Sequence, residues 1–145
     1  MIGLAVKVGA VTVAYLHEDP SSSYALLSWA APPGTPSPPV HVHHRTEEGF
    51  YVVSGTYRFL VGDETVECAA GGHVLVRPGV PHTLWNAGEQ DALALMILSP
   101  PDFAPYFREL SNGLANATDE DAALSVRREL SSRFDIEVVG QPITP

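Results

Sequence analysis

Apolar and polar positions alternate along most of the chain in a pattern that predicts β-strands. Val11, Val13 and Tyr15 occupy every second position, as in a half-buried strand, and the apolar run at residues 24–30 follows a turn rich in Ser, Pro and Asp. From residue 41 to about residue 98, further short apolar runs are separated by Gly, Asp and Asn. This regular spacing predicts an antiparallel sandwich or a small barrel.

A proline-rich segment, residues 31–39, interrupts the pattern with five prolines in nine residues. Proline lacks the backbone N–H that a central strand needs, so we expect an extended surface connection or an edge here. The segment leads the chain to a histidine-rich stretch that begins at His41.

The last third of the chain changes to a helical pattern. Phe103, Phe107 and Leu110 recur at helical spacing, and a second helix is indicated by acidic residues at its start and arginines late in it, which suits the helix dipole. We expect the apolar faces to pack against the barrel exterior. The prediction is one domain spanning residues 1–145, with a barrel core at about 24–99 and a C-terminal helical extension at about 101–134.

Charge and cysteine content narrow the range of functions. The formal net charge is -9, and the few Lys and Arg residues are spread along the chain, which argues against nucleic-acid binding. Lys7 is the only lysine, so Schiff-base chemistry is disfavoured. Cys68 is the only cysteine, which excludes an internal disulfide and a multi-thiolate metal site.

The apolar N-terminal segment, residues 1–19, does not predict a membrane span. Lys7 interrupts it, its longest uncharged run is too short to cross a bilayer, and it lacks the basic start of a signal peptide. We therefore expect a cytoplasmic protein with no membrane partner.

The stretch from His41 to Gly55 carries the first candidate metal ligands. Side chains two apart on a strand share a face, so His41 and His43 can converge on one point. Glu48 has the wrong parity for the same flat strand, so the polar residues between must form a bend. A second, distant segment supplies His82, which follows a Gly-Val-Pro turn.

Together these two segments resemble the paired motifs of the cupin family. The residues that match the first motif are His41, His43, Glu48 and Gly55, and those that match the second are Gly71, Gly79, His82 and Asn86. Two departures do not touch a ligand: the leading glycine, Gly34, comes one residue early, and Arg77 stands where the motif has proline. The segments at 99–110 and 133–143 resemble the tail of small one-domain bacterial cupins similar to quercetin dioxygenases.

The resemblance implies a fold and a metal site. The fold would be an all-β cupin barrel, a double-stranded β-helix or jelly roll, with the C-terminal helices packed outside. His41, His43, Glu48 and His82 would hold one divalent ion, and three imidazoles with a carboxylate suit Fe, Mn, Ni, Co, Cu or Zn without choosing among them. Family habit also implies a homodimer, with the N-terminal strand as a candidate interface.

The leading functional hypothesis is an oxygenase-like enzyme that acts on a small organic or aromatic substrate in the barrel. By the same resemblance Glu48 would also act as a catalytic base, and strand parity makes Phe50, Val52 and Leu84 candidate pocket walls.

Two alternatives remain open. One is a metal-containing binding or sensor module without turnover, because fold does not imply function. The other is an isomerase or decarboxylase of an anionic substrate, which would need a cation near the metal, with Arg58 and Arg77 as candidates. The remaining histidines, His44 and His73 among them, are expected to lie outside the ligand set.

Overall fold

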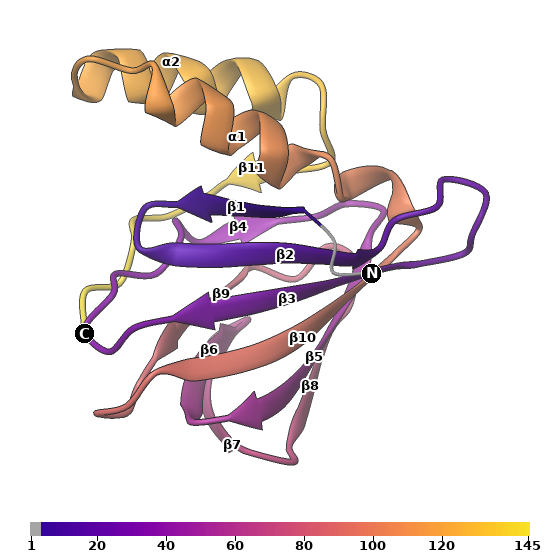
Figure 1. The fold of residues 1–145 in the computed structure, drawn as a ribbon, viewed down its shortest axis with the longest axis vertical. Coiled ribbons are helices and arrows are strands. Elements are labelled where there is room, and N and C mark those ends of the chain that lie inside the picture. Colours follow the sequence, from indigo (N-terminus) through magenta and orange to yellow (C-terminus); the bar gives the residue numbers. More distant parts are fainter. Residues whose placement is uncertain (1–3) are drawn as a thin grey trace.

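The computed structural model describes residues 4–145, which form two antiparallel sheets with helices at one end (Figure 1). In spatial order the six-stranded sheet contains β1 (Ala5–Val8), β2 (Val11–His17), β3 (Ala25–Ala31), β10 (Ala92–Ser99), β5 (Glu47–Ser54) and β8 (His73–Val76). The five-stranded sheet contains β11 (Glu137–Val138), β4 (His41–Val42), β9 (His82–Asn86), β6 (Thr56–Val61) and β7 (Glu64–Ala69). The predicted all-β class and two-sheet barrel are confirmed.

The described residues also bear on the membrane prediction. Among residues 4–145 no helix is long and apolar enough to cross a bilayer. Residues 1–3, the start of the segment considered above as a leader or membrane span, lie outside the described part of the chain.

The core lies between the two sheets and follows from the alternation seen in the sequence. In β2 and β3 every second side chain is buried, including Val13, Tyr15 and Leu27. The alternating residues point away, as the two-residue period of a strand requires. The inner faces of both sheets therefore bury their apolar side chains against each other.

Two buried polar side chains connect the sheets. The hydroxyl of Tyr57, on β6, lies 2.9 Å from the carbonyl oxygens of Trp29 and Ala92, either of which can accept its hydrogen bond. Asn86, at the end of β9, donates from Nδ2 to the carbonyl oxygen of Ala31 at 2.9 Å. Since all three acceptors belong to the opposite sheet, these bonds connect the two sheets across the barrel.

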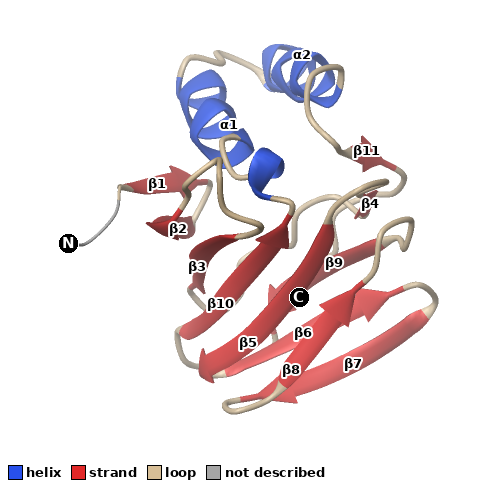
Figure 2. Ribbon diagram, turned by 90° about the vertical axis from the view of Figure 1, so that its right-hand side faces the viewer, coloured by secondary structure: helices blue, strands red, loops and turns tan. Residues whose placement is uncertain are grey.

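The C-terminal helices cover the end of the barrel where β1, β4 and β11 lie (Figures 1 and 2). They are the short 3-10 turn η1 (Pro101–Phe103), α1 (Tyr106–Ala115) and α2 (Glu120–Ser131). Asp119 caps α2 by accepting a hydrogen bond from the backbone N–H of Ala122 at 2.8 Å. The helices lie outside the barrel as predicted, but the aromatic face of α1 is turned toward the space between the sheets, which forms the site described next.

Candidate metal centre

Four buried side chains converge at the helix-covered end of the barrel. His41 on β4 pairs directly with His82 on β9, His43 follows β4, and Glu48 projects from β5 of the opposite sheet. One donor atom from each residue lies within 4.8 Å of the others. The structure thus brings together all four predicted ligand residues, and this group could hold a metal ion.

The predicted bend between the histidines and Glu48 is held by a residue from the far end of the chain, Asp135. Its carboxylate accepts hydrogen bonds from the backbone N–H groups of His44 and Arg45 and from the Thr46 hydroxyl, each at 2.8 Å. This contact fixes the turn that carries the chain from one sheet to the other. It therefore lets His43 and Glu48 face the same point despite their parity in sequence.

Backbone carbonyl groups fix the orientation of each imidazole. Nδ1 of His41 lies 2.6 Å from the carbonyl oxygen of Pro39. Nδ1 of His43 lies 2.7 Å from the carbonyl oxygen of Asp135, and Nδ1 of His82 lies 2.9 Å from that of Val80. A carbonyl oxygen only accepts hydrogen bonds, so each Nδ1 must donate. This leaves Nε2 of each ring to face the centre of the group, which is the usual arrangement of metal-binding histidines.

The contacts of Glu48 indicate that the group requires a cation. Glu48 Oε2 lies 3.1 Å from Nε2 of both His43 and His82. Because Nδ1 already donates in both rings, each Nε2 can approach a carboxylate only as a protonated imidazolium or with a positive ion between them. A divalent metal ion held at the point where the donors meet would supply that charge.

The electrostatics of the group suit the same ion. Burial, together with the two neighbouring histidines, lowers the pKa of His41 to about 3, so this ring stays neutral and keeps a lone pair to donate. Burial by itself would raise the pKa of Glu48, but the hydrogen bonds from His43 and His82 hold it well below its usual range. A neutral imidazole and an ionised carboxylate are the forms that bind first-row divalent ions.

The remaining predicted polar residues lie away from the centre. His44 is exposed, with Nε2 3.0 Å from Oε2 of Glu137, and His73 is exposed at the start of β8. Arg58 pairs with Glu67 on the outside of the barrel, and Arg77 is exposed. Neither arginine considered for an anionic substrate therefore lines the cavity.

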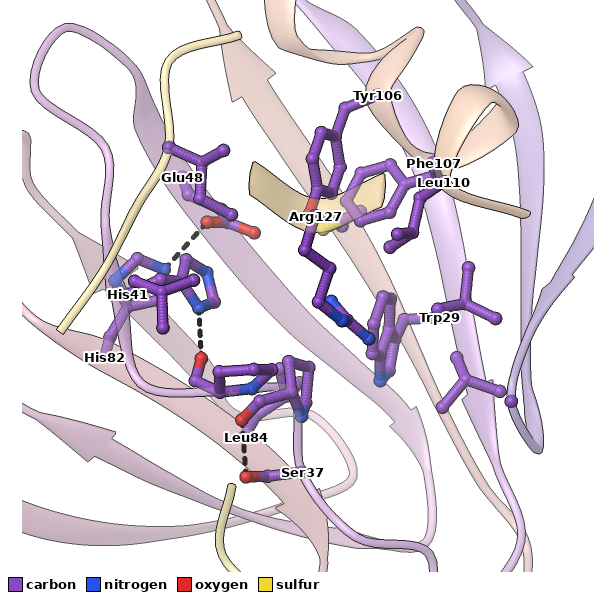
Figure 3. A pocket seen from close by; sticks show the side chains of 18 of the residues that line it. Trp29, Ser37, His41, Glu48, His82, Leu84, Tyr106, Phe107, Leu110 and Arg127 are labelled. Carbon is purple, nitrogen blue, oxygen red and sulfur yellow. Dashed lines mark hydrogen bonds and ion pairs between the residues drawn. The ribbon is translucent and has the colours of Figure 1, made fainter. Parts of the chain in front are cut away.

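A cavity of about 290 Å³ opens from the metal group toward the helices (Figure 3). Phe50 and Leu84 line it, as expected. Val52 does not: it is fully buried in the core. Strand parity gives the face on which a side chain lies but not its depth along the strand, so the expectation for Val52 differs from the structure.

Sequence reasoning missed the helical side of this cavity. Tyr106, Phe107 and Leu110 of α1 line it, and so does Arg127 of α2 (Figure 3). The helical periodicity indicated that these apolar side chains were buried, but not that they would cover the barrel interior. Nothing in the sequence distinguished Arg127 from the other arginines.

The central part of the chain matches a known domain model, and one curated protein is similar to it. Residues 27–98 match the model described as a cupin domain. An uncharacterized protein from Streptomyces coelicolor is 39% identical over 59 residues, which make up 41% of this chain and 55% of that protein. The chain therefore matches only about half the length of this relative.

Solved structures share the barrel at low sequence identity. A double-stranded β-helix protein from Klebsiella pneumoniae superimposes with a TM-score of 0.58 at 22% identity, over 66% of this chain and 82% of that one. A predicted oxalate decarboxylase from Thermotoga maritima superimposes with a TM-score of 0.59 at 24% identity, over 63% of this chain and 82% of that one. A Lactobacillus farciminis oxalate decarboxylase in complex with formate superimposes with a TM-score of 0.60 at 19% identity, over 68% of this chain and 31% of that one. These similarities concern the fold.

Proposed function

Because residues 27–98 match the cupin domain model, we propose that the chain is a metal-dependent, oxygenase-like cupin enzyme that acts on a small organic or aromatic molecule in the barrel. The observation that supports this proposal most is the buried group of three histidines and one glutamate at the inner end of a cavity. Four protein ligands leave positions open on a six-coordinate ion, whereas a closed structural site leaves none.

The donor set fits a first-row divalent ion, which would be held by His41, His43, Glu48 and His82. When bound, such an ion supplies Lewis acidity and a template for substrate binding. The chain itself keeps the three imidazoles oriented through carbonyl groups and keeps the carboxylate ionised.

Glu48 is the proposed proton acceptor. It is the only carboxylate among the described residues that line the cavity. An enol or phenol bound there would therefore transfer its proton to Glu48 and to no other carboxylate of the lining. General-base catalysis contributes a rate factor of roughly 10² to 10⁴. The tail segments resemble those of quercetin dioxygenase-like cupins, and by that resemblance Glu48 would take this proton.

The walls of the cavity support an apolar or aromatic substrate. Phe50, Leu84 and Met96 line it from the barrel, and the aromatic face of α1 closes it from above. Such walls exclude water and strengthen electrostatic interactions at the metal group. They also leave few polar partners for a sugar.

Oxygen consumption tests this function. Metal-loaded wild-type protein is screened with flavonols, diketones and other small enols, alongside His82→Ala and, as a matched control, the exposed-histidine variant His44→Ala. We expect uptake with at least one class of enol, loss of uptake in His82→Ala and retention in His44→Ala. Metal-loaded protein that consumes no oxygen with any of these classes would favour ligand binding without turnover.

We also propose that two copies pair through the N-terminal edge of the six-stranded sheet. β1 is the outermost strand of that sheet, and an edge strand offers unpaired backbone groups to a second chain. Size-exclusion chromatography with light scattering should give twice the 15.5 kDa chain mass. A species of single-chain mass at all concentrations would contradict this pairing.

A further inference from the structure

One basic side chain, Arg127, enters the cavity from the helical cover. It is the only arginine or lysine among the described residues that line the cavity, and it is half-buried on the inward side of α2. Figure 3 shows its guanidinium reaching into the space between the metal group and Trp29. The cavity therefore has an anionic carboxylate among its metal ligands and a cation on the helical wall.

Two other arginines of the helical extension are paired with carboxylates, and among the described residues Arg127 is not. Arg108 forms an ion pair with Glu18 at 2.8 Å, and Arg133 pairs with Glu109 at 2.7 Å and with Glu129. None of the ion pairs found within residues 4–145 includes Arg127. A chain with net charge -9 has ample carboxylates, yet none is placed against this guanidinium.

Tyr106 lines the cavity beside Arg127, and its phenol is neutral. Burial raises the pKa of Tyr106, and the guanidinium of Arg127 beside its hydroxyl opposes that rise. At neutral pH the tyrosine stays protonated, so it does not neutralise the arginine. The positive charge remains available to a molecule in the cavity.

Close helix packing fixes where Arg127 lies. The preceding residue, Val126, packs against Gly113 of α1 so closely that a Cβ built on the glycine would lie 2.5 Å from Val126 Cγ1. Just beyond the C-terminal end of α2, Arg133 donates a hydrogen bond to Glu109 of α1 at 2.7 Å. The two contacts hold α2 against α1 and direct Arg127 inward.

We propose that the cavity selects small organic monoacids, with a carboxylate on Arg127 and an apolar body reaching toward the metal group. This inference rests on the proposed function only in taking the cavity as the ligand site. A guanidinium binds a carboxylate through two parallel N–H···O bonds, and a partly desolvated site strengthens them. One cation in an apolar lining fits one negative charge, whereas a sugar phosphate or a dianion would need more.

The test compares acids with their uncharged amides. Binding of phenylacetate and phenylacetamide, and of 3-phenylpropionate and its amide, is measured by calorimetry on zinc-loaded and on metal-free protein. The variants are Arg127→Met, which keeps an unbranched side chain but removes the guanidinium, and Arg128→Met, which removes the adjacent exposed arginine. Circular dichroism and zinc content establish that each variant is folded and loaded.

We expect wild type and Arg128→Met to bind the acids about tenfold or more tightly than the amides, as a charge-assisted pair predicts. Arg127→Met should bind acid and amide equally and keep its zinc. Equal binding of acid and amide by wild type, binding of neither, or an acid preference that survives in Arg127→Met would overturn the inference. Failure of wild type to take up any metal would instead count against the proposed function, and the metal-free comparison still decides the role of Arg127.

Discussion

Replacement of Asp135 by alanine should weaken the metal site although Asp135 is not a ligand. The variant loses three hydrogen bonds to a carboxylate, from the His44 and Arg45 amides and the Thr46 hydroxyl, each 2.8 Å long. Hydrogen bonds to a charged group contribute about 1.5–3 kcal/mol each. Asp135 is only half-buried, so solvent replaces part of this interaction, and we expect a total loss of about 2–4 kcal/mol in the free energy of unfolding.

The same substitution should loosen the bend that joins His43 to Glu48. The backbone carbonyl of Asp135, which accepts from His43 Nδ1, remains in the variant but is no longer held by the side chain. Loss of such supporting contacts typically lowers metal affinity about 10–100-fold. Urea denaturation measures the stability, and competition with a chromophoric chelator measures the affinity for zinc.

Glu137→Gln provides the matched control. This neighbouring residue pairs with His44 in solvent, so its loss should cost less than about 1 kcal/mol and leave zinc affinity unchanged. If Asp135→Ala matches Glu137→Gln in both stability and zinc affinity, the assignment of the bend to the Asp135 carboxylate is refuted.

Three further predictions concern the barrel and the ion. Gly55→Ala should destabilise the fold by about 2–4 kcal/mol, because the residue has φ +75° and a Cβ there would lie 2.7 Å from the Cβ of Ala92. The control is Gly62→Ala, since Gly62 has φ +65° and open space around it. In the same urea titration this control should lower the free energy of unfolding by only about 1 kcal/mol. Asn86→Leu should lower stability by about 2–4 kcal/mol, because the carbonyls of Ala31 and Gln90 lose their donor, and thermal unfolding should show a lower Tm than for wild type. Removal of the metal with a chelator should also lower the Tm, because an ion at one hundred times its Kd stabilises the folded state by about 2.7 kcal/mol. An unchanged Tm after complete removal would contradict coupling of the ion to folding.

Much of the ligand set was predictable because it depends on local spacing. His41 and His43 lie two residues apart, and the strand period places them on one face without knowledge of the rest of the fold. The parity conflict of Glu48 likewise required a bend, which the structure contains at residues 44–46. That His82 joins these ligands followed only from the resemblance to a family, and its pairing with His41 across adjacent strands was not predicted, because strand order is not encoded in local periodicity.

Contacts over long sequence separations were not predictable in the same way. Asp135 holds the bend from ninety residues away, and Arg127 enters the cavity from a helix that was expected to pack against the exterior. Both lie in segments whose periodicity describes a helix or a short strand but not where that element docks. Val52 illustrates the same point within a strand, since it shares the inward face with Phe50 yet lies in the core below the cavity.

The measurement that tests the central claim most directly is the metal content of protein purified without an affinity tag or chelator. Plasma mass spectrometry on wild type, His82→Ala and the exposed control His44→Ala compares loss of a buried donor with loss of a solvent-facing imidazole. We expect near-stoichiometric iron, manganese, nickel, cobalt, copper or zinc in wild type and His44→Ala, and loss of the metal in His82→Ala. Wild-type protein that carries no such metal and cannot be loaded with any would contradict the account.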